Sequence, residues 1–278
     1  MQDLHRYVAV AEEFPNDASE KVRSGGLMHD RRVARVITPG TLIDENFMDP
    51  YASNYVMAVH LPGDVEGGTT APSPPEDDHG AASALPPGIE DPPLGLAWLD
   101  LSTGQFYTQT TQLSGLGAIL SRVAPREIVL DDAAPRRGHA LLAVLAEDRH
   151  LVTYAPASAG MRTPADWAPL LEAELPAAAA AAFHDDEVRA AGLLLRYVGD
   201  RLQGLSLKLR PPLRYGAADV MTIDRNSMRA LEIKQTIRDG AFRGSLLHAV
   251  RRTVTKSGAR LLNEWLSTPG PPFWHAVP

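Results

Sequence analysis

The sequence contains no cysteine among its 278 residues, so disulfide bonds, thiolate zinc sites and cysteine nucleophiles are all excluded. It has no apolar run near the roughly 18–20 residues that a membrane-spanning helix needs, and we expect no integral membrane protein. The N-terminus shows no signal-peptide layout, and no Asn is followed two positions later by Ser or Thr. We therefore expect an intracellular protein, and no presequence is visible.

Motifs that hold nucleotides or metals are also missing. The sequence has neither GxxxxGK followed by Ser or Thr, nor GxGxxG, and no GxSxG nucleophile motif. Its nine histidines include no pair at the i, i+4 spacing of a helical zinc site. The acidic run at 184–187 could offer metal ligands, but acids at the start of a helix are the favoured interpretation. We expect no cofactor and no catalytic or metal-binding residue in this chain.

Charge is unevenly distributed along the chain. The net charge is −7, yet residues 201–278 carry 13 basic and 5 acidic side chains. Residues 61–93 carry seven acidic and no basic side chains, together with eight prolines and five glycines, a composition that cannot bury a core. The strand-like flanks at 54–59 and 94–108 could pair as neighbours, so we predict that 61–93 is a disordered acidic insertion within one domain.

Strand-like and helix-like segments alternate after this insertion. We expect strands at 94–108, 126–130 and 150–155, and helices near 111–123, 137–147 and 185–209. Such an alternation is typical of an α/β layer.

The sequence leaves one enzymatic alternative, a metal-dependent nuclease. Asp100 lies in the glycine-terminated strand-like stretch LAWLDLSTG, and Glu127, Asp131 and Asp132 accompany the next strand. Together they could form the two-metal site of a metal-dependent nuclease. The competing interpretation is that Asp100 only caps the turn formed by the Ser-Thr-Gly that follows.

The C-terminal segment 244–266 is amphipathic with a helical period, and residues 255–258 could divide it into two helices. Five cations lie between Arg243 and Arg260. A solvated helix face explains them as well as a contact with DNA phosphates or an acidic partner does. The candidates for such a contact are Arg251, Arg252, Lys256 and Arg260.

Several stretches, in chain order, resemble the MutS family of DNA mismatch repair proteins. They are RVITPGTLIDENF (35–47), NYVMAV (54–59), LGLAWLDLSTGQF (94–106), PREIVL (125–130), MRALEI (228–233) and GSLLHAVRRTVTKSGARLLNEWLSTP (244–269). The resemblance implies the end of a mismatch-binding domain at 1–53 and a ribonuclease-H-like connector at 54–210. The helical start of a core, or lever, domain would occupy 211–278.

The resemblance also implies a function. Proteins of this family bind mismatched double-stranded DNA, use ATP and Mg, dimerise and contact downstream repair proteins. The Phe-x-Glu mismatch motif and the ATPase domain are absent here, so we expect mechanical coupling without catalysis from this chain. The segment after Pro269 departs from the family pattern, as in a truncated gene model. A truncated regulatory binding module is the remaining alternative. The residues LIDENF (42–47) and the long acidic insertion resemble the mitochondrial-type homologues of fungi. This resemblance implies that the protein is located in the mitochondrion, with the nucleus as the alternative.

Overall fold

The protein is described by a computed structural model that covers residues 7–14, 30–43, 49, 51–62, 91–135, 139–147, 149–156, 161–202, 208–216 and 221–270. Most of the predicted acidic insertion and the tail beyond residue 270 lie outside these ranges. None of the described helices is long and apolar enough to cross a membrane.

A six-stranded mixed sheet forms the centre of the fold, with the strands in the order β7-β6-β3-β4-β5-β8. Its strands are β3 (Tyr55–His60), β4 (Pro93–Asp100), β5 (Gln105–Gln112), β6 (Glu127–Asp131), β7 (Val152–Ala155) and β8 (Leu213–Arg214). Strands β3, β4 and β5 are antiparallel neighbours, whereas β6 runs parallel to β3, and β7 parallel to β6. Three antiparallel strands followed by two parallel ones is the ribonuclease-H-like order, which confirms the predicted fold class.

The two flanks of the acidic insertion are hydrogen-bonded partners. Val56 of β3 lies opposite Leu99 of β4 in an antiparallel register. The predicted strand 94–108 is wrong as a single element, because it forms the β4–β5 hairpin with a turn at 101–104. Gly104 closes this turn at a φ of 69°, a conformation that a side chain disfavours.

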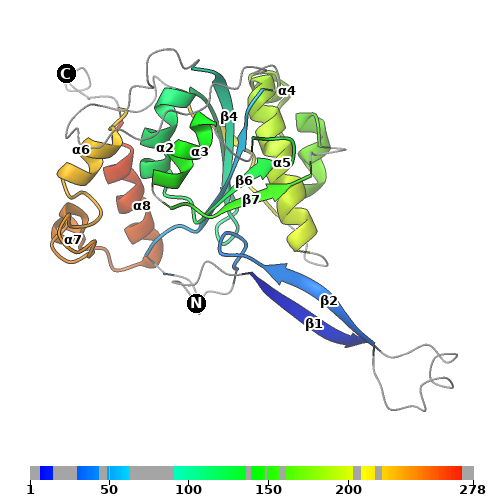
Figure 1. The fold of residues 1–278 in the computed structure, drawn as a ribbon, viewed down its shortest axis with the longest axis horizontal. Coiled ribbons are helices and arrows are strands. Elements are labelled where there is room, and N and C mark those ends of the chain that lie inside the picture. Colours follow the sequence, from blue (N-terminus) through cyan, green and yellow to red (C-terminus); the bar gives the residue numbers. More distant parts are fainter. Residues whose placement is uncertain are drawn as a thin grey trace, which may run out of the picture.

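Helices cover both faces of the sheet (Figure 1). Helix α5 (Asp185–Arg201) covers one face, and α2 (Leu116–Val123) and α3 (Ala140–Glu147) cover the other. Side chains alternate along each strand, so Leu99 packs toward α5 whereas Trp98 packs toward α2. Burial on both faces explains why the strand sequences are almost continuously apolar. Helix α5 ends at Arg201, earlier than the predicted residue 209.

The remaining elements extend from this central layer. They are β1 (Val8–Phe14), β2 (Asp30–Ile37), η2 (Leu113–Gly115), η3 (Pro164–Leu170), α4 (Ala177–Ala180), α6 (Arg225–Ala230), α7 (Leu246–Val250) and α8 (Lys256–Ser267). Strands β1 and β2 form a hairpin that projects from the body, and α6, α7 and α8 lie beside α2 (Figure 1).

The predicted division of the C-terminal segment is confirmed. Residues 251–255 separate α7 from α8, and the Thr255 side chain caps α8 by accepting a hydrogen bond from the Gly258 amide at 3.0 Å. The apolar side chains of this segment are largely exposed: Val254 is 99% and Trp265 63% accessible.

Candidate functional site

Asp100 has a structural environment. It is fully buried, and its Oδ1 atom accepts hydrogen bonds from the Ser102 amide at 2.8 Å and the Ser102 hydroxyl at 2.7 Å. Its Oδ2 atom accepts from the Asn54 amide at 3.2 Å. The carboxylate therefore fixes the β4–β5 turn, as the interpretation without catalysis predicts.

The structure does not bring the four nuclease candidates together. Asp100 lies two residues after Trp98 on β4, so its side chain points to the same face of the sheet, the one that α2 covers. Glu127 lies on the opposite face, where it accepts a hydrogen bond from Tyr197 of α5. Asp131 ends the five-residue strand that Glu127 begins, roughly 13 Å away at about 3.3 Å per residue. Across the described part of the chain, no cluster of three or more His, Cys, Asp or Glu side chains could hold a metal.

The acidic run at 184–187 starts α5, as predicted. The His184 amide donates to Glu187 Oε2 at 2.8 Å in a capping box. Glu187 is fully buried and forms an ion pair with Arg214 at 2.9 Å.

Glu127 joins the N-terminal segment to the sheet. This side chain is fully buried at the start of β6. Its Oε2 atom accepts hydrogen bonds from the Thr38 hydroxyl and from the Gly40 amide at 3.2 Å. Its Oε1 atom accepts from the Thr153 hydroxyl at 2.7 Å and from the Tyr197 hydroxyl at 2.5 Å. We call this arrangement the Glu127 junction.

The turn that enters the Glu127 junction is held by its own side chains. The Thr38 amide donates to Thr41 Oγ1 at 2.9 Å, and the Thr41 amide donates to the Thr38 carbonyl at 3.1 Å. A Cβ atom on Gly40 would lie 2.9 Å from the Cβ atoms of Glu127 and Val56, so only glycine approaches the sheet this closely. Burial raises the pKa of the Tyr197 hydroxyl, and the nearby Glu127 carboxylate raises it further, because both disfavour the phenolate.

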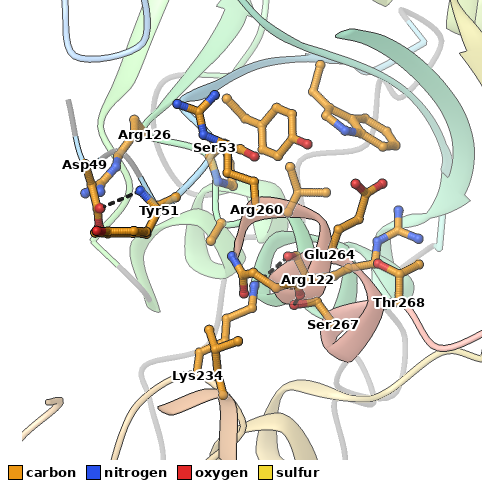
Figure 2. Close-up of a pocket in the computed structure, with 18 of the residues that line it drawn as sticks. Asp49, Tyr51, Ser53, Arg122, Arg126, Lys234, Arg260, Glu264, Ser267 and Thr268 are labelled. Atoms are coloured by element: carbon orange, nitrogen blue, oxygen red, sulfur yellow. Dashed lines mark hydrogen bonds between the residues drawn. The ribbon is translucent and has the colours of Figure 1, made fainter. Parts of the chain in front are cut away.

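A second junction joins the C-terminal segment to α2. The Lys234 ammonium donates to the carbonyls of Ser121 at 3.3 Å and Arg122 at 2.7 Å, in the last turn of α2. A cation at this position satisfies carbonyls that lack a helical partner. In Figure 2 the Lys234 side chain reaches up to this helix end. Nearby, the Tyr215 hydroxyl donates to Glu264 of α8 at 3.2 Å. We call these contacts the Lys234 junction.

Beside the Lys234 junction lies a cleft of about 760 Å³ (Figure 2). Its floor is aromatic: the Arg122 guanidinium lies over the rings of Trp98, at 5.6 Å, and Tyr215, at 5.0 Å, and donates to Gln109 at 2.6 Å. Its charged lining residues are Arg122, Arg126, Arg149, Lys234, Arg251, Arg260, Asp49 and Glu264. We call it the basic cleft.

The four predicted contact residues have two different environments. Arg251 and Arg260 line the basic cleft, where Arg251 lies over Tyr51 at 4.6 Å and Arg260 donates to the Ser102 hydroxyl at 3.2 Å. Arg252 and Lys256 are exposed and do not line it. A role of these residues in contacting DNA or a partner stays a prediction.

Lys234 makes stability depend on pH. Burial, with the nearby Arg122 charge, lowers the pKa of Lys234 from 10.5 to about 8. Between these two values the unfolded chain binds a proton that the folded chain does not, so stability rises with pH. We expect wild type to gain on the order of 2–3 kcal/mol over Lys234→Met between pH 8 and 10.5.

Chemical unfolding of both proteins at matched pH values measures this gain. The comparison between the two proteins removes the titration of the tyrosines, which they share. A constant difference between the two proteins across this range would contradict the pKa given for Lys234.

Comparisons with known proteins agree with the order of these parts. The family model described as MutS domain II matches residues 81–210, and the one described as MutS domain III matches residues 226–270. The predicted boundaries after residues 53 and 210 stay predictions.

Bacterial relatives resemble nearly the whole chain. The DNA mismatch repair protein MutS of Synechocystis sp. is 30% identical over 275 residues, covering 94% of this chain and 28% of that protein. The MutS proteins of Microcystis aeruginosa (31% over 274 residues) and Bradyrhizobium sp. (32% over 269 residues) each cover 94% of this chain, with shares of 28% and 26% of their own lengths. The chain thus spans little more than a quarter of these relatives. The two domain models match in the order of the structural parts, and the MutS relatives match nearly the whole chain. The chain therefore belongs to the MutS family of DNA mismatch repair proteins.

Proposed function

We propose that this chain holds the connector of a mismatch repair protein, and that the connector passes conformational change between its neighbours, the parts before and after it. In the whole protein one neighbour would bind mismatched double-stranded DNA, and the other would lead to an ATPase that uses ATP and Mg. A family dimer partner and downstream repair proteins complete the proposed assembly. The chain itself performs no bond chemistry.

One observation carries this proposal: both neighbours attach to the same short segment, residues 121–127. The Lys234 junction holds the carbonyls of Ser121 and Arg122 at the end of α2. Glu127, only five residues later, holds the turn at Thr38 and Gly40.

The segment between these attachment points is short and fixed. Ala124 ends α2 in the left-handed conformation at a φ of 49°, and the Arg126 amide donates to the Tyr55 carbonyl at 2.8 Å. A displacement of either neighbour therefore moves the backbone to which the other is bound.

A chimera tests the proposal. This chain would replace the matching segment of the Synechocystis MutS, and the chimera would be assayed for mismatch binding, for mismatch-dependent ATP turnover and for lowering the mutation rate of cells without MutS. We expect activity in all three assays. A folded chimera that binds mismatches but leaves the mutation rate unchanged would contradict the proposal.

The Lys234→Met variant of the chimera separates coupling from stability. The variant removes only the contact between Lys234 and α2, so we expect its affinity for mismatched DNA to stay within about twofold of the parent chimera. The stimulation of ATP turnover by a mismatch should fall about fivefold or more, which is the size of effect that a typical coupling free energy produces. Lys208→Met, which removes an exposed lysine, is the matched control and should change neither. Equal losses of affinity and stimulation would indicate a purely structural role.

A further inference from the structure

The basic cleft concentrates positive charge in a concave space. Six of its lining residues are cationic and two are acidic, although the chain as a whole has a net charge of −7. The cations come from three separate places: the end of α2 with the turn that leads to β6, the residues before β7, and the C-terminal segment. Convergence from distant parts of the chain distinguishes this cleft from the solvated face of a single helix.

Within the described ranges, several of these cations are not paired with an acid. Among the described residues, no carboxylate forms an ion pair with Arg122, Arg126, Arg149 or Arg251. Lys234 bonds only to carbonyl oxygens there. The two acids are fixed by neighbouring groups, since Glu264 accepts from the Tyr215 hydroxyl at 3.2 Å and Asp49 accepts from the Tyr51 amide at 2.9 Å. With six cations against two acids, the cleft keeps an excess of positive charge.

The floor of the cleft is already fixed. Arg251 lies between the rings of Tyr51 and Phe242, at 4.6 and 4.4 Å from their centroids. Arg122 is held over Trp98 and Tyr215 in the same way. Rings position these guanidinium groups without neutralising them, so their charge remains available to a ligand.

The pKa of Lys234 is shifted within this cleft. Burial is the main reason that the pKa of Lys234 is lowered, and the positive charge of Arg122 lowers it further. An anion in the cleft would oppose the repulsion between Lys234 and Arg122.

We propose that the basic cleft binds a small oligophosphate, either free or as the phosphate tail of a nucleotide. Arg126 and Arg149 at the exposed rim would attract the anion, and Arg122, Lys234 and Arg251 would face it inside. Guanidinium groups suit phosphate oxygens because they donate in a fixed, planar pattern. The binding does not depend on the coupling function proposed above.

The size of the cleft favours a small ligand over duplex DNA. A volume of about 760 Å³ lies in the usual range for pockets that enclose small molecules. A cube of that volume measures about 9 Å on a side, whereas the major groove of a duplex is by itself roughly 12 Å wide. The interior of the cleft is therefore better matched to a small anion than to a duplex.

Calorimetric titration of the 278-residue chain with inorganic tripolyphosphate tests this proposal. We expect binding that weakens as salt is raised and that falls at least about tenfold in the Arg126→Gln/Arg149→Gln double variant. Both residues are exposed, so the thermal midpoint should stay unchanged. The control is Arg252→Gln/Lys256→Gln, which removes the same charge from exposed positions outside the cleft and should bind as wild type does.

Further titrants identify the ligand's source. Tighter binding of ATP than of tripolyphosphate would assign the site to a nucleotide, and equal or weaker binding would assign it to a free oligophosphate. Three results would overturn the proposal: no heat of binding with either titrant, equal losses in the two double variants, or binding of a DNA duplex that depends on Arg126 and Arg149 where tripolyphosphate does not bind.

Discussion

Replacing Glu127 by alanine should destabilise the protein by about 3–4 kcal/mol. The substitution removes the acceptor of four hydrogen bonds, from Thr38, Gly40, Thr153 and Tyr197, at a fully buried position. A buried donor left without an acceptor costs about 1–3 kcal/mol, and partial relaxation of the three hydroxyl groups keeps the total below the simple sum. A drop of roughly 10 °C in the thermal midpoint corresponds to this loss.

Two further variants define the cause. In Glu127→Gln the amide nitrogen can take the place of Oε1, where the hydroxyl groups of Thr153 and Tyr197 can turn to accept from it, while the remaining oxygen still accepts from Thr38 and Gly40. We therefore expect a smaller loss of about 1–2 kcal/mol. Glu172→Ala removes a glutamate whose side chain is 50% exposed and lies 3.9 Å from Arg210, and such a surface pair contributes at most about 1 kcal/mol. Similar unfolding midpoints for Glu127→Ala and Glu172→Ala would show that the Glu127 junction does not stabilise the fold.

The pairing of the two flanks of 61–93 and the α/β alternation followed from local signals in the sequence, whereas the ribonuclease-H-like arrangement was implied by the family resemblance. Apolar, β-branched runs alternate with helical periods, and the segments on either side of 61–93 are the kind that pair. The acids and apolar stripe of 185–209 likewise predicted α5, although the helix ends at Arg201. These features are periodic or compositional, so a single sequence displays them. The hairpin at 101–104 was missed as a strand boundary because both of its arms are strongly strand-like.

The two junctions had no such signal. Glu127 binds residues 89 positions before it and 26 and 70 positions after it. Lys234 binds a carbonyl 112 positions earlier. Single polar residues that meet across such separations create no period, and their pairing depends on the completed sheet. The motifs around them, TPGT and PREIVL, pointed to the family without indicating the contact that joins them.

The basic cleft shows how regional charge can mislead. Arg122, Arg126 and Arg149 belong to residues 94–200, where 13 acids outnumber 8 basic side chains. The sequence therefore indicated the basic C-terminal segment instead. Of the four candidates predicted there, Arg251 and Arg260 line the cleft and the other two do not. The acids of 94–200 are distributed elsewhere in the fold, partly as the caps and buried acceptors described above.

Gly95 sets how closely α5 approaches the sheet, and Gly95→Ala should cost about 3 kcal/mol or more. An added Cβ atom would lie 1.9 Å from the carbonyl oxygen of Asp186, in the first turn of α5. Backbone in a helix cannot turn aside as a flexible side chain can, so the whole helix end must shift outward. Overpacking of this kind costs about 1–3 kcal/mol and more when the backbone must move.

The same substitution at Gly199 is the matched control, because nothing lies within 4 Å of a Cβ atom there. Gly199 belongs to the exposed face of α5, where alanine should stabilise the helix by about 0.5–1 kcal/mol. Guanidinium unfolding of the two variants should therefore give midpoints on opposite sides of the wild-type value. Destabilisation by both substitutions would mean that α5 tolerates no added helix propensity. A neutral Gly95→Ala would mean that the close approach of α5 to β4 is not what fixes the connector's layers.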